Sequence, residues 1–138
     1  LELPLIESID ALKAFARFSY RLHNLGIFHD DYTIDNILYC FSENGYDFSL
    51  IDNNRMRFRK YSYGRGVKNL ERLRFSADKM GIIAAEYAKL ANENDIRTLS
   101  AMSFFRLRYL LKVSLKKGFK NLIQLIIVKP HIPLSNTK

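Results

Sequence analysis

The chain contains a single cysteine, Cys40, and no tryptophan among its 138 residues. One cysteine cannot form an internal disulfide bond, so the sequence argues against a disulfide-stabilised secreted domain and favours a reducing compartment. Cys40 itself is expected as a buried strand residue. No signal peptide is visible, and the longest apolar run, residues 122–128, is too short to span a membrane. We therefore expect a cytoplasmic location.

Acidic residues are absent from the C-terminal part of the chain. Residues 96–138 contain nine Lys or Arg and no Asp or Glu, whereas residues 1–95 contain 13 Lys or Arg and all 14 acidic residues. This asymmetry indicates an anionic partner, which could be a membrane leaflet, a phosphorylated glycolipid or nucleic acid, unless it marks only a solvated helical face. Nucleic acid is the least favoured, because no recognised binding motif accompanies the charge.

Hydrophobic spacing predicts a mainly helical fold with one small β-hairpin, in a single domain spanning 1–138. A helix is expected over 8–24, with Ser8 as its N-cap and Gly26 just beyond its end. The other expected elements are strands over 37–41 and 48–51 joined by a turn, helices over 67–91 and 96–117, an apolar helical segment over 119–128, and a flexible tail over 133–138. Four residues of the helix over 96–117 are expected in the core: Phe104, Phe105, Tyr109 and Leu110.

Polar side chains flank the predicted hairpin. His29, Asp31 and Asn36 precede its first strand with the spacing His-x-Asp-x-x-x-x-Asn, and Asp52 follows its second strand. Because a hairpin brings its open ends together, Asn36 and Asp52 should lie close to each other. Such groups serve phosphoryl transfer from ATP, and their oxygens suit magnesium better than zinc. The alternative is that they are only turn and cap residues.

This region resembles the lipopolysaccharide core kinases, which have a protein-kinase-like fold and phosphorylate Kdo or heptose. The helix, the polar loop, the hairpin and the second acidic site follow in the family's order over about residues 10–76. The stretch Ile51-Asp52-Asn53-Asn54-Arg55 and the basic, leucine-containing stretch over 68–76 also fit the family's pattern. The resemblance implies a mainly α (α+β) C-terminal lobe, made of helices and one small hairpin.

The resemblance also implies the roles of particular residues. Asp31 would be the catalytic aspartate that orients the acceptor hydroxyl, and Asn36 and Asp52 would hold magnesium and the phosphates of ATP. His29 would support the loop, and Leu38 would lie beneath the adenine. The acceptor would be a sugar hydroxyl of the lipopolysaccharide inner core.

The basic residues around this site allow more than one reading. Arg55, Arg57 and Arg59 would share one face of an extended segment. Arg55 and Arg57 could bind acceptor phosphates or carboxylates, or could only protect an edge strand by their charge. Arg72 and Arg74 are interpreted as solvated helix residues. The basic C-terminal region is expected to contact the anionic inner membrane peripherally, where a lipid-linked acceptor is assembled.

Several features separate this sequence from an ordinary protein kinase. Asp30 adds a negative charge beside Asp31, and Asn54 stands where protein kinases have the Gly of Asp-Phe-Gly. No Ala-Pro-Glu follows Asp52, which favours a sugar or another small acceptor over a protein. The alternatives are another small-molecule kinase of the same fold, such as an aminoglycoside or choline kinase, or an inactive pseudokinase or binding module.

The N-terminal lobe of such a kinase is not recognisable in this sequence. The 138 residues contain neither a glycine-rich phosphate loop nor a Val-Ala-x-Lys strand, and the chain begins with Leu1 rather than Met. Both missing motifs belong to the N-terminal lobe, which covers the phosphates of ATP. We therefore expect the 138 residues to be part of a longer protein and to be inactive, or nearly so, on their own.

Overall fold

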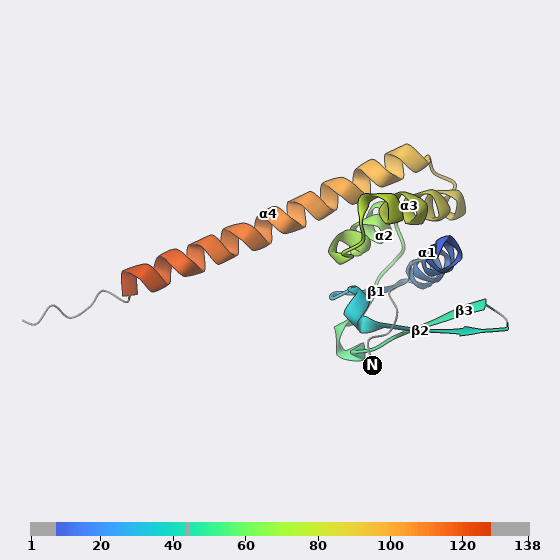
Figure 1. The fold of residues 1–138 in the computed structure, drawn as a ribbon, viewed down its shortest axis with the longest axis horizontal. Helices are drawn as coiled ribbons and strands as arrows, with labels where there is room; N and C mark the ends of the chain where they lie inside the picture. Colours follow the sequence, from blue (N-terminus) through green and yellow to red (C-terminus); the bar gives the residue numbers. More distant parts are fainter. Residues whose placement is uncertain (1–7, 44, 128–138) are drawn as a thin grey trace, which may run out of the picture.

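The computed structural model describes residues 8–43 and 45–127, with side chains as far as Ile123. These residues form four α-helices: α1 (Ile9–Asn24), α2 (Tyr63–Asn69), α3 (Ala77–Ala91) and α4 (Asp95–Ile127). Helix α1 packs between the hairpin and α3, and α3 packs in turn on α4 (Figure 1). The mainly helical fold expected from the sequence is confirmed.

Two antiparallel strand pairs accompany the helices in the described part of the chain. Strand β2 (Ile37–Ser42) pairs with β3 (Gly45–Leu50), with Ile37 opposite Leu50, which confirms the predicted hairpin. Strand β1 (Ile27–His29) pairs with β4 (Met56–Phe58), with His29 opposite Met56. This second pair was not predicted, because its three-residue strands are too short to give a periodic pattern. It fixes the two chain segments on either side of the hairpin against each other.

Helix α1 has the ends that the sequence predicts. The Ser8 hydroxyl accepts a hydrogen bond from the Ala11 N–H at 3.1 Å, so Ser8 is the N-cap. Gly26 follows the helix with a φ of +77°, and a Cβ at this position would lie 2.6 Å from the Arg59 carbonyl oxygen. The buried face of helix α1 contributes to the core, which includes Leu12, Phe15, Ala16, Tyr32, Leu70, Ile83 and Tyr87.

The prediction of one helix over 67–91 is wrong. Helix α2 ends at Asn69, a 3-10 turn η3 (Leu70–Arg72) follows, and Leu73 is extended with a ψ of 130°. Helix α3 then begins at Ala77, after Ser76. The break places the side chain of Asn69 on the backbone of β1, where it accepts from the His29 N–H and donates to the His29 carbonyl. This long-range contact leaves no trace in the local spacing of apolar residues.

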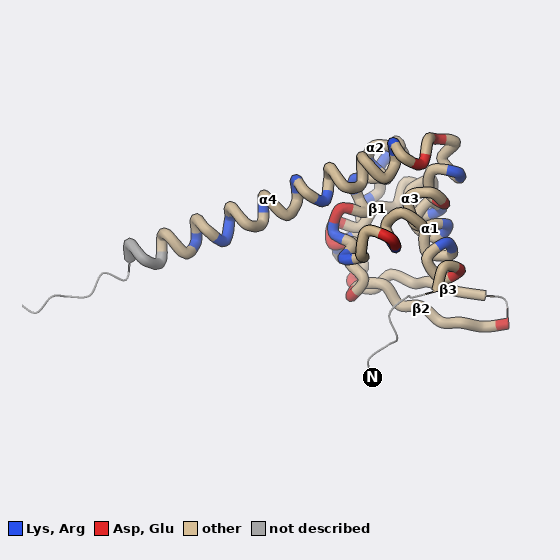
Figure 2. The backbone as a smooth tube through the Cα atoms, turned by 45° about the horizontal axis from the view of Figure 1, so that its top comes forward, with Lys and Arg blue, Asp and Glu red and all other residues tan. Residues whose placement is uncertain are grey.

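The prediction of two separate C-terminal helices is also wrong, because α4 continues through Gly118 as far as Ile127. One glycine inside a helix costs only about 1 kcal/mol relative to alanine, which the Leu- and Lys-rich flanks tolerate. The tail expected over 133–138 lies outside the described residues. Figure 2 shows Lys and Arg along α4 and no acidic residue beyond its first turn.

Much of α4 is exposed, contrary to the core prediction for two of its residues. Phe104 is 60% exposed and Leu110 is 52% exposed, whereas Phe105 and Tyr109 are partly buried. The reason is that α4 packs on the domain only with its N-terminal half, through Thr98 and Met102, and then extends away from it (Figure 1). No helix in the described ranges is long and apolar enough to cross a membrane.

The close approach of α2 to α3 gives a stability test. Gly66 is buried, and a Cβ there would overlap the Tyr87 hydroxyl and lie 3.2 Å from His23 Nδ1. We expect Gly66→Ala to lower the free energy of unfolding by about 1–3 kcal/mol, because both neighbours are held in the core. Gly64→Ala in the same helix is the control, since nothing lies within 4 Å of its Cβ. Urea unfolding of the two variants measures the difference, and equal stabilities would contradict the close packing.

Candidate active site

The imidazole ring of His29, at the end of β1, joins two polar loops. The first contains Asp31 and precedes β2, and the second contains Asp52 and follows β3. His29 Nε2 lies 3.2 Å from the Ile51 carbonyl oxygen and 3.1 Å from that of Asp52, while its Nδ1 accepts from the Asp31 N–H at 3.2 Å. This pattern requires the ring proton on Nε2 and a lone pair on Nδ1. His29 is buried, so these hydrogen bonds are shielded from water. The ring thus fixes the backbone of Asp31 and of Asp52, the two acidic residues of the predicted site.

Asn36 and Asp52 lie at the open end of the hairpin, as predicted. Asn36 Nδ2 donates to the Asp31 carbonyl at 2.9 Å, and the Ile51 N–H donates to the Asn36 carbonyl at 3.0 Å. These two hydrogen bonds connect the loop that contains Asp31 to the chain that leads into Asp52. Because the amide nitrogen of Asn36 is held by Asp31, its Oδ1 is left as the acceptor that a cation would require.

Asp52 has a left-handed backbone, with φ 59° and ψ 57°. Non-glycine residues rarely adopt this conformation, although Asp and Asn are enriched there, and such residues cluster at functional sites. The left-handed residue turns the chain out of β3 into the 3-10 turn η2 (Asn53–Arg55) and then into β4. The conformation therefore sets the direction in which the Asp52 carboxylate leaves the hairpin.

The Asp31 carboxylate pairs with Arg72 of η3, with Oδ1 2.8 Å from Nη1. Both side chains are about one third exposed, at 32% for Asp31 and 31% for Arg72. Oδ1 is buried beside the positive charge of Arg72 and has no hydrogen-bond partner among the residues that the structure describes. The prediction that Arg72 is a solvated residue is wrong, because the break between α2 and α3 turns it toward the loop.

The additional acidic residue, Asp30, has its own partner. Arg57 Nε lies 2.9 Å from Asp30 Oδ2, across the β1–β4 pair. Arg55 Nε lies 3.6 Å from Asp52 Oδ2. The two arginines predicted to bind the acceptor therefore lie beside the acidic residues of the site, and their role toward an acceptor stays a prediction. Exposed pairs of this kind contribute about 1 kcal/mol or less to stability, so they mainly balance charge.

Leu38 lies on the exposed face of the hairpin, between the two polar loops. It is 44% exposed and stands opposite Ser49. Cys40 lies two residues further along β2 and is also exposed, so the expectation of a buried cysteine is wrong. Ile37, the residue before Leu38, points to the other side of the strand and is buried in the core. The exposed side of β2 thus presents an apolar residue next to the predicted magnesium ligands.

A buried hydrogen-bond network supports the site from the core. His23 Nδ1 lies 2.9 Å from the Tyr87 hydroxyl, and His23 Nε2 lies 3.1 Å from Asn69 Oδ1. Asn69 in turn holds the backbone of His29. The network was missed in the sequence, although the polar Asn69 beside the apolar Val67 and Leu70 was a signal that could have been noticed. Asn69, in α2, thus connects α1 and β1, at His29, where the loop that contains Asp31 begins.

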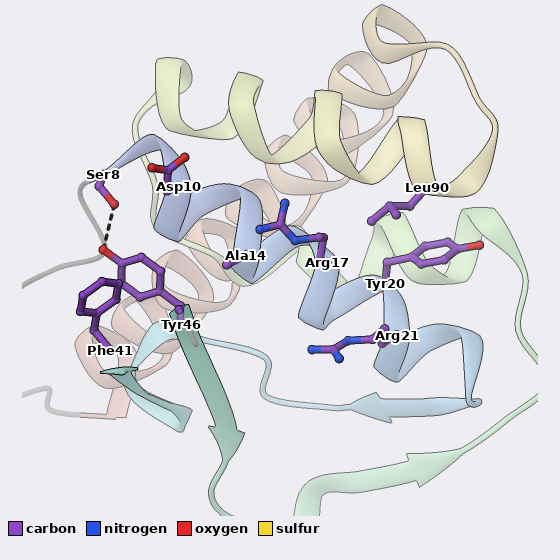
Figure 3. A pocket seen from close by; sticks show the side chains of 10 residues that line it. Ser8, Asp10, Ala14, Arg17, Tyr20, Arg21, Phe41, Tyr46 and Leu90 are labelled. Carbon is purple, nitrogen blue, oxygen red and sulfur yellow. Dashed lines mark hydrogen bonds between the residues drawn. The ribbon is translucent and has the colours of Figure 1, made fainter. Parts of the chain in front are cut away.

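A sizeable cavity lies elsewhere in the described part of the chain. It has a volume of about 710 Å³ and lies along α1, next to the tip of the hairpin and Leu90 (Figure 3). Arg17 and Arg21 extend from α1 at this cavity, and the Ser8 hydroxyl bonds the Tyr46 hydroxyl at 3.1 Å (Figure 3). None of the predicted site residues lines it. Volume alone therefore does not locate the candidate active site, which is defined by its side-chain chemistry.

The donor set at the hairpin suits a magnesium ion that arrives with a nucleotide. Among the described residues, no three or more His, Cys, Asp or Glu side chains are grouped to hold a metal by themselves. Magnesium at a nucleotide site needs fewer protein ligands, because it is bound through one or two carboxylates together with phosphate oxygens. The free amide oxygen of Asn36 and the partly exposed carboxylate of Asp52 fit this requirement.

A His-x-Asp-x-x-x-x-Asn loop joined to a second Asp is the arrangement of phosphotransferases of the protein-kinase type. The chain belongs to the lipopolysaccharide kinase (Kdo/WaaP) family, whose model matches residues 8–93. The match includes Asp31, Asn36 and Asp52, and it ends before α4. It confirms the resemblance seen in the sequence. Comparisons with the curated proteins and with the solved structures gave no match.

The supporting network gives a pH-dependent stability. Burial lowers the pKa of His23 from 6.5 to about 4, although the hydrogen bond to Asn69 acts in the opposite direction. The unfolded chain therefore binds a proton below about pH 6.5 that the folded chain does not bind until about pH 4. This contribution to the free energy of unfolding, up to about 3 kcal/mol, is present above pH 6.5 and is lost as the pH falls toward 4.

Urea unfolding at about pH 7 and about pH 5 tests this prediction, with His23→Gln as the comparison. The glutamine has no titration in this range but keeps a donor and an acceptor for Tyr87 and Asn69. We expect the free energy of unfolding of the variant to change less between the two pH values. An equal change in both proteins would show that His23 is not the group responsible.

Proposed function

We propose that the protein is an ATP-dependent kinase that phosphorylates a sugar hydroxyl, Kdo or heptose, of the lipopolysaccharide inner core. Family membership supports the reaction type. The hydrogen bonds that join Asn36 to Asp31 and to Ile51, the residue before Asp52, support the position of the chemistry. The observation that carries the proposal is the His29 ring, because it fixes the loops of both predicted acidic residues with one side chain.

Asp31 acts on the acceptor hydroxyl. Its Oδ1 is buried against Arg72, so Oδ2 is the oxygen available to a hydroxyl donor. The hydroxyl oxygen attacks the γ-phosphorus of ATP, the bond from this phosphorus to the β–γ bridging oxygen breaks, and ADP leaves. The hydroxyl proton passes to Asp31. The ion pair with Arg72 orients the carboxylate, which favours a position for the hydroxyl in line with the phosphate.

Asn36 and Asp52 would hold the magnesium ion that arrives with ATP. Bound magnesium supplies charge neutralisation of the phosphate oxygens, which is the main electrostatic requirement of phosphoryl transfer. The chain's part is to present two hard oxygen ligands at a fixed separation, and the hydrogen bonds of Asn36 to Asp31 and Ile51 provide the rigidity. Leu38, exposed beside them, offers the apolar surface on which the adenine would lie.

An Asp31 variant tests the reaction. Transfer of phosphate from ATP to purified lipid-linked core saccharide is measured with the longest form of the protein that contains these residues. We expect Asp31→Asn to reduce transfer by about 10²–10⁴-fold, because the amide cannot accept the proton. Asp47→Asn removes an exposed acid of β3 that contacts no predicted site residue, and it should leave the rate unchanged.

The outcomes separate the alternatives. Transfer that persists in Asp31→Asn would contradict the assigned role of Asp31. Magnesium–ATP binding without transfer to any core saccharide would favour a pseudokinase, and transfer only to aminoglycoside or choline acceptors would favour another small-molecule kinase.

We also propose that α4 binds the anionic inner membrane peripherally, where the acceptor is assembled. Residues spaced by three or four positions form an exposed apolar ridge on this helix, consisting of Leu107, Leu111, Leu115, Phe119 and Leu122. Lysines follow the ridge one position later, at 112, 116 and 120, so apolar and basic rows lie side by side. A helix with these two rows is suited to the membrane interface, with its apolar row at the acyl chains and the exposed Lys117 and Lys120 at anionic headgroups.

Vesicle binding tests the ridge. We expect binding to phosphatidylglycerol-containing vesicles to weaken steeply with salt, because about 1 kcal/mol per nearby basic residue comes from attraction to the surface. Leu115→Ser should weaken it about tenfold through lost apolar burial. Leu25→Ser on the globular part is the matched control, since both leucines are 73% exposed. Salt-independent binding, or equal effects of the two variants, would contradict the proposal.

A further inference from the structure

A basic groove lies beside the contact between α4 and the turn η3. Its volume is about 410 Å³, and five cationic side chains line it: Lys68, Arg72, Arg108, Lys112 and Lys116. One wall is therefore the second half of α2 with η3, and the other wall is the middle of α4. Concave sites of this size are large enough to surround a small ligand.

The groove carries an excess of positive charge. Only two acidic side chains line it, Asp30 and Glu71, and Asp30 is already paired with Arg57. Arg72 is paired with Asp31, but Lys68, Arg108, Lys112 and Lys116 form no ion pair with any residue that the structure describes. Unpaired cations around a shared depression repel one another and create a positive potential, and a bound anion relieves both effects.

Arg72 connects this groove to the candidate active site. Its guanidinium reaches Asp31 at 2.8 Å, donates to the Asp30 carbonyl at 3.2 Å and lies 5.2 Å from the ring centre of Tyr109 on α4. Arg106 adds a second link between α4 and the domain, because its Nη1 donates to the Phe75 carbonyl at 2.6 Å. The wall formed by α4 is thus held in place beside the loop that contains Asp31.

We propose that this groove binds the acceptor saccharide through its anionic groups and so places the reacting hydroxyl at Asp31. The ligand class is a sugar chain that carries carboxylate or phosphate groups. Lys112 and Lys116 would bind the part of the saccharide away from the reacting sugar, and they are specificity residues rather than catalytic ones. The inference rests on the proposed kinase function, and it assigns a role to α4, which lies beyond the residues matched by the family model.

Binding measured without ATP tests the groove separately from catalysis. The 138-residue chain is titrated with a Kdo disaccharide, with the same disaccharide after reduction of its carboxyl groups, and with a heptose phosphate, and binding is followed by NMR chemical shifts. We expect Lys112→Gln/Lys116→Gln to weaken binding of an anionic probe about tenfold, through the loss of charge-assisted contacts. The control Lys13→Gln/Lys89→Gln removes two exposed lysines of α1 and α3 and should bind as the unchanged chain does.

The reduced disaccharide provides a second measurement that needs no variant. Recognition of carboxylates predicts that it binds at least about tenfold more weakly than the Kdo disaccharide. Tight binding of the heptose phosphate alone would instead identify phosphate as the recognised group. Equal affinities of the groove and control variants would overturn the proposal, and so would the absence of binding to both anionic probes. Failure of phosphate transfer in the Asp31 assay would overturn the kinase function, while this titration would still decide the groove.

Discussion

The arrangement of the candidate site depends on one buried imidazole. His29 uses both ring nitrogens to bond backbone groups of two segments that are distant in sequence: Asp31 on one side, and Ile51 and Asp52, just after β3, on the other. Its own backbone is held by Asn69, Asn69 is hydrogen-bonded to His23, and His23 is hydrogen-bonded to Tyr87 in the core. The packing of α1 against α3 therefore fixes His23 and Tyr87, and a chain of buried hydrogen bonds extends from them to the loops of the site. Such a network is stabilising only when each member is satisfied, so a change at Tyr87 would be felt at Asp31.

The charges of the site are balanced locally on one side and left unbalanced on the other. Asp30, Asp31 and Asp52 each lie beside an arginine that comes from a neighbouring turn or strand. On α4 the cations have no such partners among the described residues, apart from Arg97 at its start. Because the acidic residues of the site are paired and the basic residues of α4 are not, the electrostatic potential becomes more positive from the site toward the groove. An anionic ligand approaching the protein would be drawn to α4 first and to the loop afterwards.

The sequence predicted which polar residues lie together better than it predicted the helix boundaries. The His29–Asn36 spacing, the hairpin and Asp52 are local in sequence, so turn chemistry and alternation were enough to place them together. The break after Asn69 was missed because its cause is a hydrogen bond to a distant strand, and Arg72 was misread with it. The continuity of α4 through Gly118 was missed because a weak helix breaker was given too much weight. The wrong predictions thus concern features that depend on tertiary contacts or on small differences in free energy.

The left-handed backbone at Asp52 has an evolutionary consequence. Glycine and asparagine also tolerate this conformation, and each is one nucleotide change away from an aspartate codon. Drift at this position would therefore lead to folded descendants that have lost the carboxylate, with the hairpin and the His29 hydrogen bonds intact. A lineage released from selection for catalysis could lose its chemistry here while keeping its shape, its groove and its charge. Position 52 is accordingly the one to inspect first when relatives of this chain are sorted into active and inactive members.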